Sequence, residues 1–360
     1  MIKVCWISNA PSPYKVAFMN ELGKQVELTC LFEMHAEKDR NASWYDYDAL
    51  NFNAIYLDDG DGRKHINHCA KECDVLINSD YSKPACRFAV RAFHQQQKKT
   101  ILHADGGLVK ERGLFDKIIS HVMRRNDAFM SSGKEVNRYF EYYGVKPELI
   151  HNYRFASTNQ MGMEENYQLH QNQELYRNEL QMKEETVLLS IGSPIPRKGF
   201  DILVRAMKDI PSHVGLYIIG GEPQKEVAAY VQDNALTNIH FLPFFDWEML
   251  KKYYAAADLF VLPTRYDIWG LVINEAMSFG LPFISTDHCV AAKEFVGKDE
   301  CGKIVPIEDV NALKEAIEGL VSDPNKRKEM GEKGYQIIRD YTYENMVEDF
   351  VKILNSVVGN

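Results

Sequence analysis

Short apolar runs alternate with segments of helical period along most of the chain. In the first half, the runs that we interpret as strands are residues 4–8, 26–32, 74–79, 100–104, 128–131 and 149–152. In the second half they are residues 187–191, 215–219, 239–242, 259–262, 283–285 and 302–305. Runs this apolar are typical of parallel sheets buried on both faces, and the helices between them indicate βαβ units. The pattern therefore predicts an α/β fold.

One polar segment, residues 156–185, interrupts this alternation. It is rich in Gln, Asn and Glu and lacks strand character. The length of 360 residues suits two domains better than one core. We expect a Rossmann-like first domain over residues 1–160, a connection with some helix over 161–185, and a second Rossmann-like domain over 186–340. We expect residues 341–360 to form a helix that packs back toward the first domain.

Composition and charge narrow the class of protein. The net charge of −9 argues against general nucleic-acid binding. Residues 1–160 carry +2 and the remainder carries −11, so the two domains are expected to face different partners. The seven cysteines are scattered and indicate reduced core residues. No apolar run reaches the roughly 18 residues of a membrane span and no signal peptide precedes Met1, so we expect a cytoplasmic location.

The most informative stretch is residues 262–285, LPTRYDIWGLVINEAMSFGLPFIS. It has the layout of a strand, a turn, a helix over residues 271–279 and a second strand. Asp267 and Glu275 bracket the turn with seven residues between them. The N–H groups at the start of a helix can hold an anion, and Glu275 lies one turn further on. Such a site offers N–H groups to a phosphate and carboxylates to sugar hydroxyls, which suits a nucleotide sugar.

A second stretch, residues 191–200, places Arg197, Lys198 and Gly199 between a strand and a helix. Two cations at a helix start are unfavourable, because that end of the helix dipole attracts anions. Such a departure from local stability suggests a functional role. A bound phosphate, clamped by Arg197 and Lys198, explains the pattern. The alternative is a solvated surface loop without a ligand.

These stretches resemble the nucleotide-binding domain of glycosyltransferase family 4, whose members are retaining enzymes of the GT-B architecture. With the segment Gly220-Gly221-Glu222-Pro223 between them, they keep the order and spacing of the family pattern from residue 186 onward. The resemblance implies two Rossmann-like parallel-sheet domains that face each other across a cleft. It also implies no metal and no cofactor, because cations and helix dipoles hold the donor.

The resemblance also implies roles for individual residues. Glu275 would accept hydrogen bonds from the ribose, Asp267 would hold hydroxyls of the donor sugar, and Lys198 would pair with the diphosphate. Arg197 would supply a second cation, since Ser193 replaces the arginine that is common in the family. The complete predicted donor-binding set is Arg197, Lys198, Gly199, Glu222, Asp267, Trp269, Gly270, Leu271 and Glu275.

In the first half, the strand at residues 100–104 ends in His103-Ala104-Asp105-Gly106-Gly107, at the edge where open α/β sheets bind ligands. In the family, a His or Asp near this point often lies beside the transferred sugar. The predicted catalytic set is therefore His103, Asp105, Lys198 and Asp267. The alternative is a turn formed by Asp-Gly-Gly that has no chemical role.

Residues 108–125 contain an apolar stripe with Lys117, Arg124 and Arg125 beside it. Such a helix either packs on its own sheet or rests at the inner face of an anionic membrane, where a lipid-linked acceptor would reside. A further helical spacing, His65, Cys69 and Cys73, would suit a metal, but no ligand outside this helix is apparent. We expect core cysteines and surface histidines there, and no metal.

The resemblance as a whole implies a retaining glycosyltransferase. It would move a sugar from a nucleotide-sugar donor to a glycan acceptor, free or lipid-linked, in bacterial capsule, exopolysaccharide or lipopolysaccharide assembly. The alternatives are a nucleotide-sugar epimerase or hydrolase of the same fold, or a catalytically silent sugar-nucleotide-binding protein. A dinucleotide-dependent oxidoreductase is disfavoured, because neither first strand is followed by Gly-x-Gly-x-x-Gly.

Overall fold

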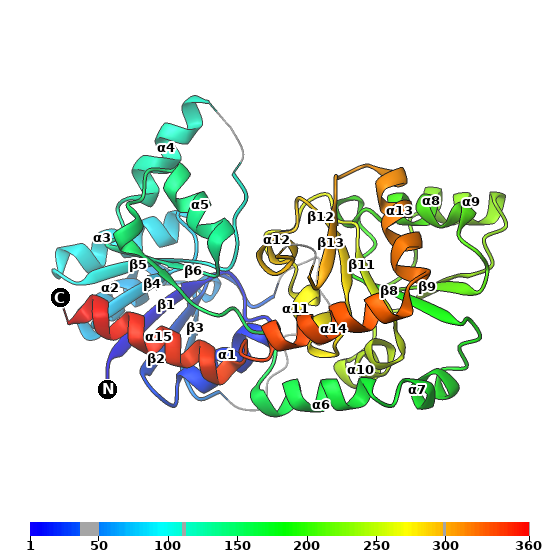
Figure 1. Ribbon diagram of the computed structural model, residues 1–360. Helices are drawn as coiled ribbons and strands as arrows, with labels where there is room; N and C mark the ends of the chain where they lie inside the picture. Colours follow the sequence, from blue (N-terminus) through cyan, green and yellow to red (C-terminus); the bar gives the residue numbers. More distant parts are fainter. Residues whose placement is uncertain (37–49, 110–112, 298–299, 360) are drawn as a thin grey trace. The chain divides into compact units, whose positions relative to one another are not determined.

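The computed structural model describes residues 1–36, 50–109, 113–297 and 300–359. The chain divides into two units (Figure 1). The first unit comprises residues 1–157 and 341–360, and the second comprises residues 158–340. Each unit is a parallel sheet with helices packed on it, so the predicted α/β fold with two Rossmann-like domains is confirmed.

The sheet of the first unit has the order β3-β2-β1-β4-β5-β6-β7, and all of its described pairings are parallel. The strands are β1 (Lys3–Ser8), β2 (Glu27–Phe32), β3 (Asn53–Tyr56), β4 (Val75–Asn78), β5 (Lys99–Ala104), β6 (Ala128–Ser131) and β7 (Ile150–Asn152). The helices are α1 (Pro13–Leu22), α2 (Gly62–Glu72), α3 (Pro84–Gln95), α4 (Leu114–Met123), α5 (Lys134–Tyr142) and α15 (Tyr343–Val358).

The sheet of the second unit has the order β10-β9-β8-β11-β12-β13, again with parallel pairings. Its strands are β8 (Thr186–Ile191), β9 (Val214–Ile219), β10 (Ile239–Leu242), β11 (Leu259–Leu262), β12 (Phe283–Thr286) and β13 (Gly302–Val305). Its helices are α6 (Gln160–His170), α7 (Gln173–Glu179), α8 (Phe200–Ala206), α9 (Lys225–Asp233), α10 (Trp247–Ala256), α11 (Leu271–Ser278), α12 (Val290–Phe295), α13 (Val310–Val321) and α14 (Pro324–Ile338).

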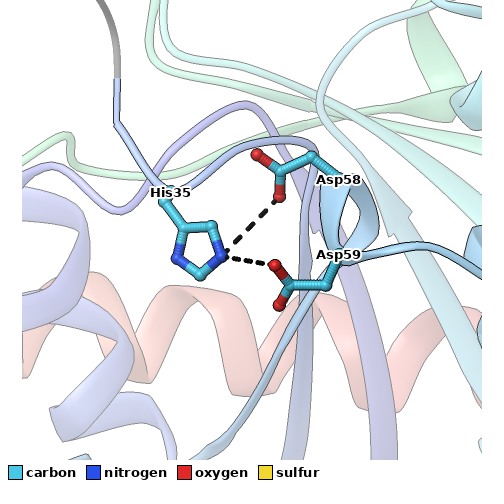
Figure 2. Close-up of side chains that lie close together, drawn as sticks. All are labelled: His35, Asp58 and Asp59. Carbon is cyan, nitrogen blue, oxygen red and sulfur yellow. Dashed lines mark hydrogen bonds and ion pairs between the residues drawn. The ribbon is translucent and has the colours of Figure 1, made fainter.

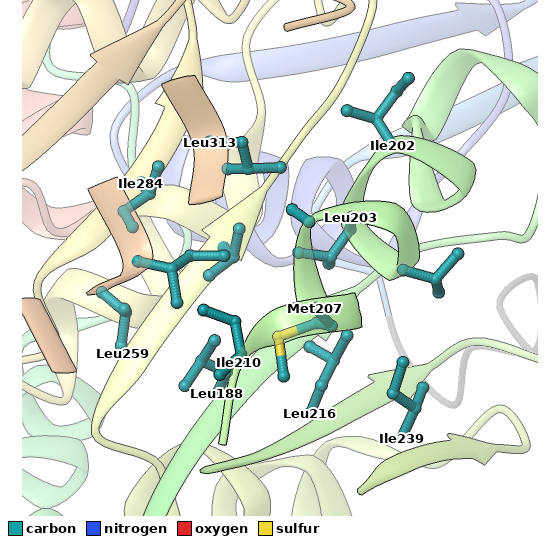
Figure 3. Close-up of a cluster of buried hydrophobic side chains, with 14 of the residues drawn as sticks. Leu188, Ile202, Leu203, Met207, Ile210, Leu216, Ile239, Leu259, Ile284 and Leu313 are labelled. Carbon is teal, nitrogen blue, oxygen red and sulfur yellow. The ribbon is translucent and has the colours of Figure 1, made fainter. Parts of the chain in front are cut away.

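A large apolar core holds α8, α9 and α13 against the sheet of the second unit (Figure 3). Leu188 and Leu259 from the strands contact Leu203 of α8 and Met207, which directly follows α8. All four side chains are fully buried. Every residue of β8, β9 and β11 is buried, which explains their continuous apolar runs. This packing fixes the carboxyl ends of the strands, where the candidate site lies.

Two features differ from the expectations. Residues 161–185, expected as a connection between the domains, contribute α6 and α7 to the second unit, where both helices lie against α10. The edge strand β3 was not predicted, because its four residues are exposed or only partly buried and therefore carry no continuous apolar signal. The final helix α15 belongs to the first unit and lies against α1 (Figure 1).

Candidate functional site

The loop after β8 is held against the end of β11 by a close backbone contact. Gly199 has φ +71°, and a Cβ atom there would lie 2.0 Å from the carbonyl oxygen of Pro263. The carbonyl oxygen of Arg197 accepts hydrogen bonds from the Thr264 hydroxyl (3.0 Å) and from the N–H of Arg265 (2.8 Å). These contacts fix the backbone from which the Arg197 and Lys198 side chains extend.

Lys198 and Asp267, 69 residues apart, meet directly. The Lys198 ammonium donates a hydrogen bond of 2.7 Å to Asp267 Oδ2, and both side chains are largely buried. The guanidinium of Arg197 lies 3.3 Å from the same oxygen and donates to the carbonyl oxygen of Tyr266 at 2.7 Å. The predicted phosphate-binding cations and the predicted sugar-binding carboxylate therefore form one cluster.

The turn from Asp267 to Gly270 is pinned to the segment that opens α12. The Asp267 N–H donates to the His288 carbonyl oxygen at 3.0 Å, and the Trp269 carbonyl accepts from the Ala291 N–H at 2.8 Å. Gly270 has φ +97°, which favours glycine. Its hypothetical Cβ would also lie 2.7 Å from the Cys289 sulfur. The conformation at Gly270 thus requires a residue without a side chain.

Helix α11 begins at Leu271, as predicted, and ends one residue earlier than predicted. Trp269, just before it, is buried and donates from Nε1 to the side-chain oxygen of Asn274 at 2.9 Å. In an α-helix, the N–H groups of the first turn have no partner within the helix. Gly270 and Leu271 therefore bring potential anion-binding groups to the turn that carries Asp267.

Glu275 follows one turn into α11 and is partly buried. The hydroxyl of Tyr254, from α10, donates a hydrogen bond of 2.7 Å to Glu275 Oε2. Burial raises the pKa of Glu275, while the Tyr254 hydrogen bond and the charge of Lys198 act in the opposite direction. Tyr254 is a part of this site that the sequence did not reveal, because no local motif marks it.

Glu222, the remaining member of the predicted donor set, is exposed in the loop after β9. This loop touches the loop after β8, since a Cβ atom on Gly220 would lie 2.1 Å from the Gly192 carbonyl oxygen. A pocket of about 220 Å³ lies nearby, between α8 and α9, with Asp201, Arg205 and Tyr230 in its lining. Neither Lys198 nor Glu275 lines this pocket, so it is separate from the predicted donor cluster.

In the first unit, His103 and Asp105 lie together at the carboxyl end of β5. The His103 Nε2 atom is 3.2 Å from Asp105 Oδ1, but the two are not aligned for a hydrogen bond. Nε2 therefore lacks a hydrogen-bond partner within the described part of the chain. Asp105 accepts hydrogen bonds from the hydroxyls of Tyr153 (3.2 Å) and Tyr14 (3.3 Å). Burial lowers the pKa of His103, which favours the neutral form of the imidazole.

Helix α4 lies only in part against its neighbours. Ser120 donates to the Tyr143 carbonyl oxygen at 2.6 Å and Met123 is fully buried, so one side of α4 packs on the first unit. Phe115 and Ile118 are 68% and 60% exposed. Of the predicted stripe over 108–125, residues 110–112 lie outside the described part. No described helix is long and apolar enough to span a membrane.

Among the described residues, one group of potential metal ligands lies close together: His35, Asp58 and Asp59, all of them exposed (Figure 2). His35 Nε2 lies 2.9 Å from Asp59 Oδ1 and 3.9 Å from Asp58 Oδ1, which is the geometry of a surface ion pair. Cys69 on α2 and Cys73 just after it are buried, while His65 is partly buried and His68 is exposed.

Comparison with known proteins adds the family to this geometry. Residues 172–337 match the model of the family described as "Glycosyl transferases group 1". Over its second unit, the chain is similar to group 1 glycosyltransferases. The matched range contains every residue of the predicted donor set.

Two curated relatives illustrate the likeness in sequence. The lipopolysaccharide core biosynthesis glycosyltransferase LpsE of Rhizobium meliloti is 28% identical, with 47% of this chain and 50% of that protein covered. The lipopolysaccharide glucosyltransferase WaaG of Escherichia coli is 30% identical, with 38% of each chain covered. The chain thus spans half or less of these relatives.

The likeness in structure extends over the whole chain. The structure of HepE from Anabaena in complex with UDP and glucose has a TM-score of 0.78 at 15% identity, with 99% of this chain and 100% of that chain covered. The crystal structure of WaaG has a TM-score of 0.68 at 16% identity, with 99% and 100% covered. At these identities the likeness shows the fold, which is GT-B.

Proposed function

We propose that this protein is a retaining glycosyltransferase that moves a sugar from a nucleotide-sugar donor to a glycan acceptor. The observation that carries the proposal is the cluster of Lys198, Arg197 and Asp267 beside the start of α11, with Glu275 one turn further on. Cations and helix N–H groups suit a diphosphate, and carboxylates suit hydroxyls. The similarity to group 1 glycosyltransferases over the same residues supports this assignment.

In the proposed mechanism the second unit binds the donor and the first unit binds the acceptor. The bond between the anomeric carbon and the diphosphate oxygen breaks, and the acceptor oxygen forms its bond to that carbon on the same face. The acceptor proton passes to the departing diphosphate. Lys198 and Arg197 stabilise the charge that develops on this leaving group, and they do so from a prearranged backbone.

The neutral His103 is proposed to lie beside the transferred sugar. Its Nε2 atom is buried yet has no aligned partner among the described residues, so a sugar hydroxyl would satisfy it. Asp105 is held by two tyrosine hydroxyls and stays partly exposed. Both groups are thereby oriented before a substrate binds, which supports a positioning role at the reaction centre.

The names of the relatives suggest a first donor and a setting. LpsE and WaaG are glycosyltransferases of lipopolysaccharide biosynthesis, and HepE was solved with UDP and glucose. We therefore propose surface-polysaccharide assembly as the setting. A uridine diphosphate hexose is the first donor to test, ahead of guanosine and thymidine diphosphate sugars.

We also propose that α4 contacts an anionic membrane that holds a lipid-linked acceptor. Phe115 and Ile118 are three residues apart, so both project from one side of the helix, and both are largely exposed. Lys117, Arg124 and Arg125 are exposed on or next to this helix. Apolar side chains flanked by cations are the combination that binds such a surface.

The test is a transfer assay over a panel of donors, with NMR used to read the anomeric configuration of the product. We expect transfer with the configuration of the donor retained, and at least about a tenfold loss in Lys198→Ala, or about 1.4 kcal/mol of transition-state stabilisation. Inversion would refute the retaining mechanism. Sugar release at an equal rate without acceptor would identify a hydrolase, and binding without turnover would identify a silent binding protein.

A further inference from the structure

A set of aromatic rings encloses the imidazole of His103. The Trp6 ring, from β1, meets it edge-on with a centroid separation of 5.0 Å, and the Tyr153 ring stacks on it at 5.1 Å. The Phe350 ring, from α15, lies 5.5 Å away. His103 is consequently only 4% exposed. Three elements that are far apart in the sequence thus surround one predicted catalytic side chain.

Phe350 is the ring that joins this set together. Besides His103, it stacks on Trp6 with a centroid separation of 5.5 Å and meets the edges of Phe18 at 4.8 Å and Tyr153 at 4.9 Å. Its side chain is fully buried. Phe350 lies on α15, which follows the whole second unit along the chain, so it reaches His103 only through the return of the chain to the first unit.

Helix α15 is anchored beside the same site by Arg154. The guanidinium of Arg154 donates to both carboxylate oxygens of Asp349, at 2.8 and 2.7 Å, and to the Asn345 carbonyl oxygen at 3.2 Å. The backbone N–H of Arg154 also donates to Asp349, at 3.0 Å. A bidentate pair of this kind fixes direction as well as distance. Arg154 directly follows Tyr153, whose hydroxyl donates to Asp105 and whose ring stacks on His103. The anchor therefore lies next to both predicted catalytic residues of the first unit.

We propose that α15 is a positioning element for His103 and Asp105, and that Phe350 is its positioning residue, fixing the imidazole plane and keeping water away from it. The consequence for catalysis rests on the proposed function, in which His103 lies beside the transferred sugar. The physical coupling between Phe350 and His103 does not rest on it. In this proposal, α15 is part of the site as well as a structural support of the first unit.

The charges around His103 show how this coupling can be measured. Asp105 raises the pKa of His103, and Lys15 from α1 and burial lower it, with burial the largest effect. The Tyr153 hydroxyl is directed to Asp105, and the Asp349 carboxylate on α15 is paired with Arg154. The element α15 thus presents an apolar ring to the imidazole. A smaller side chain at position 350 would admit water, favour the charged form and raise the pKa of His103.

The experiment is an NMR titration of His103 in the full chain, with its resonance assigned by its absence in His103→Gln. In Phe350→Leu we expect the pKa of His103 to move up toward that of a solvated histidine. Val357→Ala is the matched control, because Val357 is buried on the same helix about two turns away, roughly 10 Å along the axis. It should titrate as the unmodified protein does.

A second variant, Asp349→Asn, covers the case in which Phe350→Leu fails to fold. It weakens the anchor and leaves every ring in place, and it should shift the pKa of His103 in the same direction by less. In the transfer assay, Phe350→Leu should lower kcat at least about fivefold with an unchanged donor KM. As the pH is lowered, the activity of Phe350→Leu should be lost at a higher pH than that of the unmodified protein, because His103 is protonated at a higher pH.

Two results would overturn the positioning role. One is a His103 titration in Phe350→Leu and Asp349→Asn identical to that of the unmodified protein. The other is an equal loss of kcat in Phe350→Leu and Val357→Ala, which would indicate a merely structural helix. Failure of the proposed function has a different signature, because the titration shift would remain while no donor was bound or turned over.

Discussion

The Asp267 carboxylate is paired with both cations that are proposed to hold the diphosphate. Lys198 donates to Asp267 at 2.7 Å and Arg197 lies 3.3 Å from the same oxygen. If the proposed donor site is correct, we expect a diphosphate to compete with Asp267 for these two cations. The carboxylate would then be able to accept hydrogen bonds from sugar hydroxyls, so the proposal links binding of the phosphates to recognition of the sugar.

At the residue scale, Tyr254 should control how well Glu275 binds the ribose. In Tyr254→Phe the hydrogen bond to Glu275 is lost, and a partly buried carboxylate is left with one partner fewer. We expect the donor KM to rise several-fold and the free energy of unfolding to fall by about 1 kcal/mol. Tyr253→Phe is the matched control, since Tyr253 is the buried neighbour on α10.

The same substitution should change the pH dependence of donor binding. Burial already raises the pKa of Glu275, and the Tyr254 hydrogen bond counteracts that rise. Without the hydrogen bond the pKa rises further, so the carboxylate is protonated at a higher pH. Donor affinity, measured by calorimetry from neutral to acid pH, should therefore fall earlier in Tyr254→Phe. Identical profiles in Tyr254→Phe and Tyr253→Phe would contradict the role assigned to Tyr254.

The candidate site was only partly predictable at this scale. Lys198, Asp267 and Glu275 could be predicted as site residues from local motifs, because each lies in or next to a turn or helix start with a recognisable sequence. The contacts of Tyr254 and Phe350 depend on how the helices pack. Both residues lie within apolar helical patterns, so the sequence does not distinguish them from ordinary core residues. Even the ion pair of Lys198 with Asp267 joins residues 69 apart and is set by the fold.

At the scale of elements, α4 is expected to bind anionic vesicles. Replacing Phe115 and Ile118 together by Ser removes the two largely exposed apolar side chains while the cations remain. Flotation with vesicles of anionic lipid should be seen in the unmodified protein and lost in this double variant. Each Lys or Arg near such a surface contributes about 1 kcal/mol, so added salt should also weaken the association.

Leu175→Ser provides the matched control for α4. Leu175 is 60% exposed on α7, in the second unit, so it has comparable exposure at a different place. This variant should float as the unmodified protein does. Absence of flotation in the unmodified protein, or an equal loss in Leu175→Ser, would refute a membrane contact through α4.

The elements themselves were predicted where burial leaves a continuous apolar signal. Strands β8, β9 and β11 are buried throughout and stand out in the sequence. Strand β3 is an edge strand of mixed exposure and does not. Helices α6 and α7 were interpreted as a connection because they are polar: α6 buries only Met163 and Asn166, and α7 buries none of its residues. Their place in the second unit comes from contacts with α10.

At the scale of the whole molecule, each of the two Rossmann-like units has its own proposed role: the second binds the donor and the first binds the acceptor. The second unit carries the donor cluster and the match to group 1 glycosyltransferases. The first unit carries His103 and Asp105, and it is completed by α15 from the end of the chain. The proposed positioning role predicts that removal of α15 disrupts the surroundings of His103 in the first unit.

The most direct measurement of the central claim is the affinity for a nucleoside diphosphate, by calorimetry on the full chain. In Lys198→Met the Kd should rise at least tenfold, about 1.4 kcal/mol, while affinity for the nucleoside without phosphates stays the same. In Glu275→Gln affinity for both compounds should fall, because both carry the ribose. An unchanged nucleoside diphosphate affinity in Lys198→Met and Glu275→Gln would contradict the account.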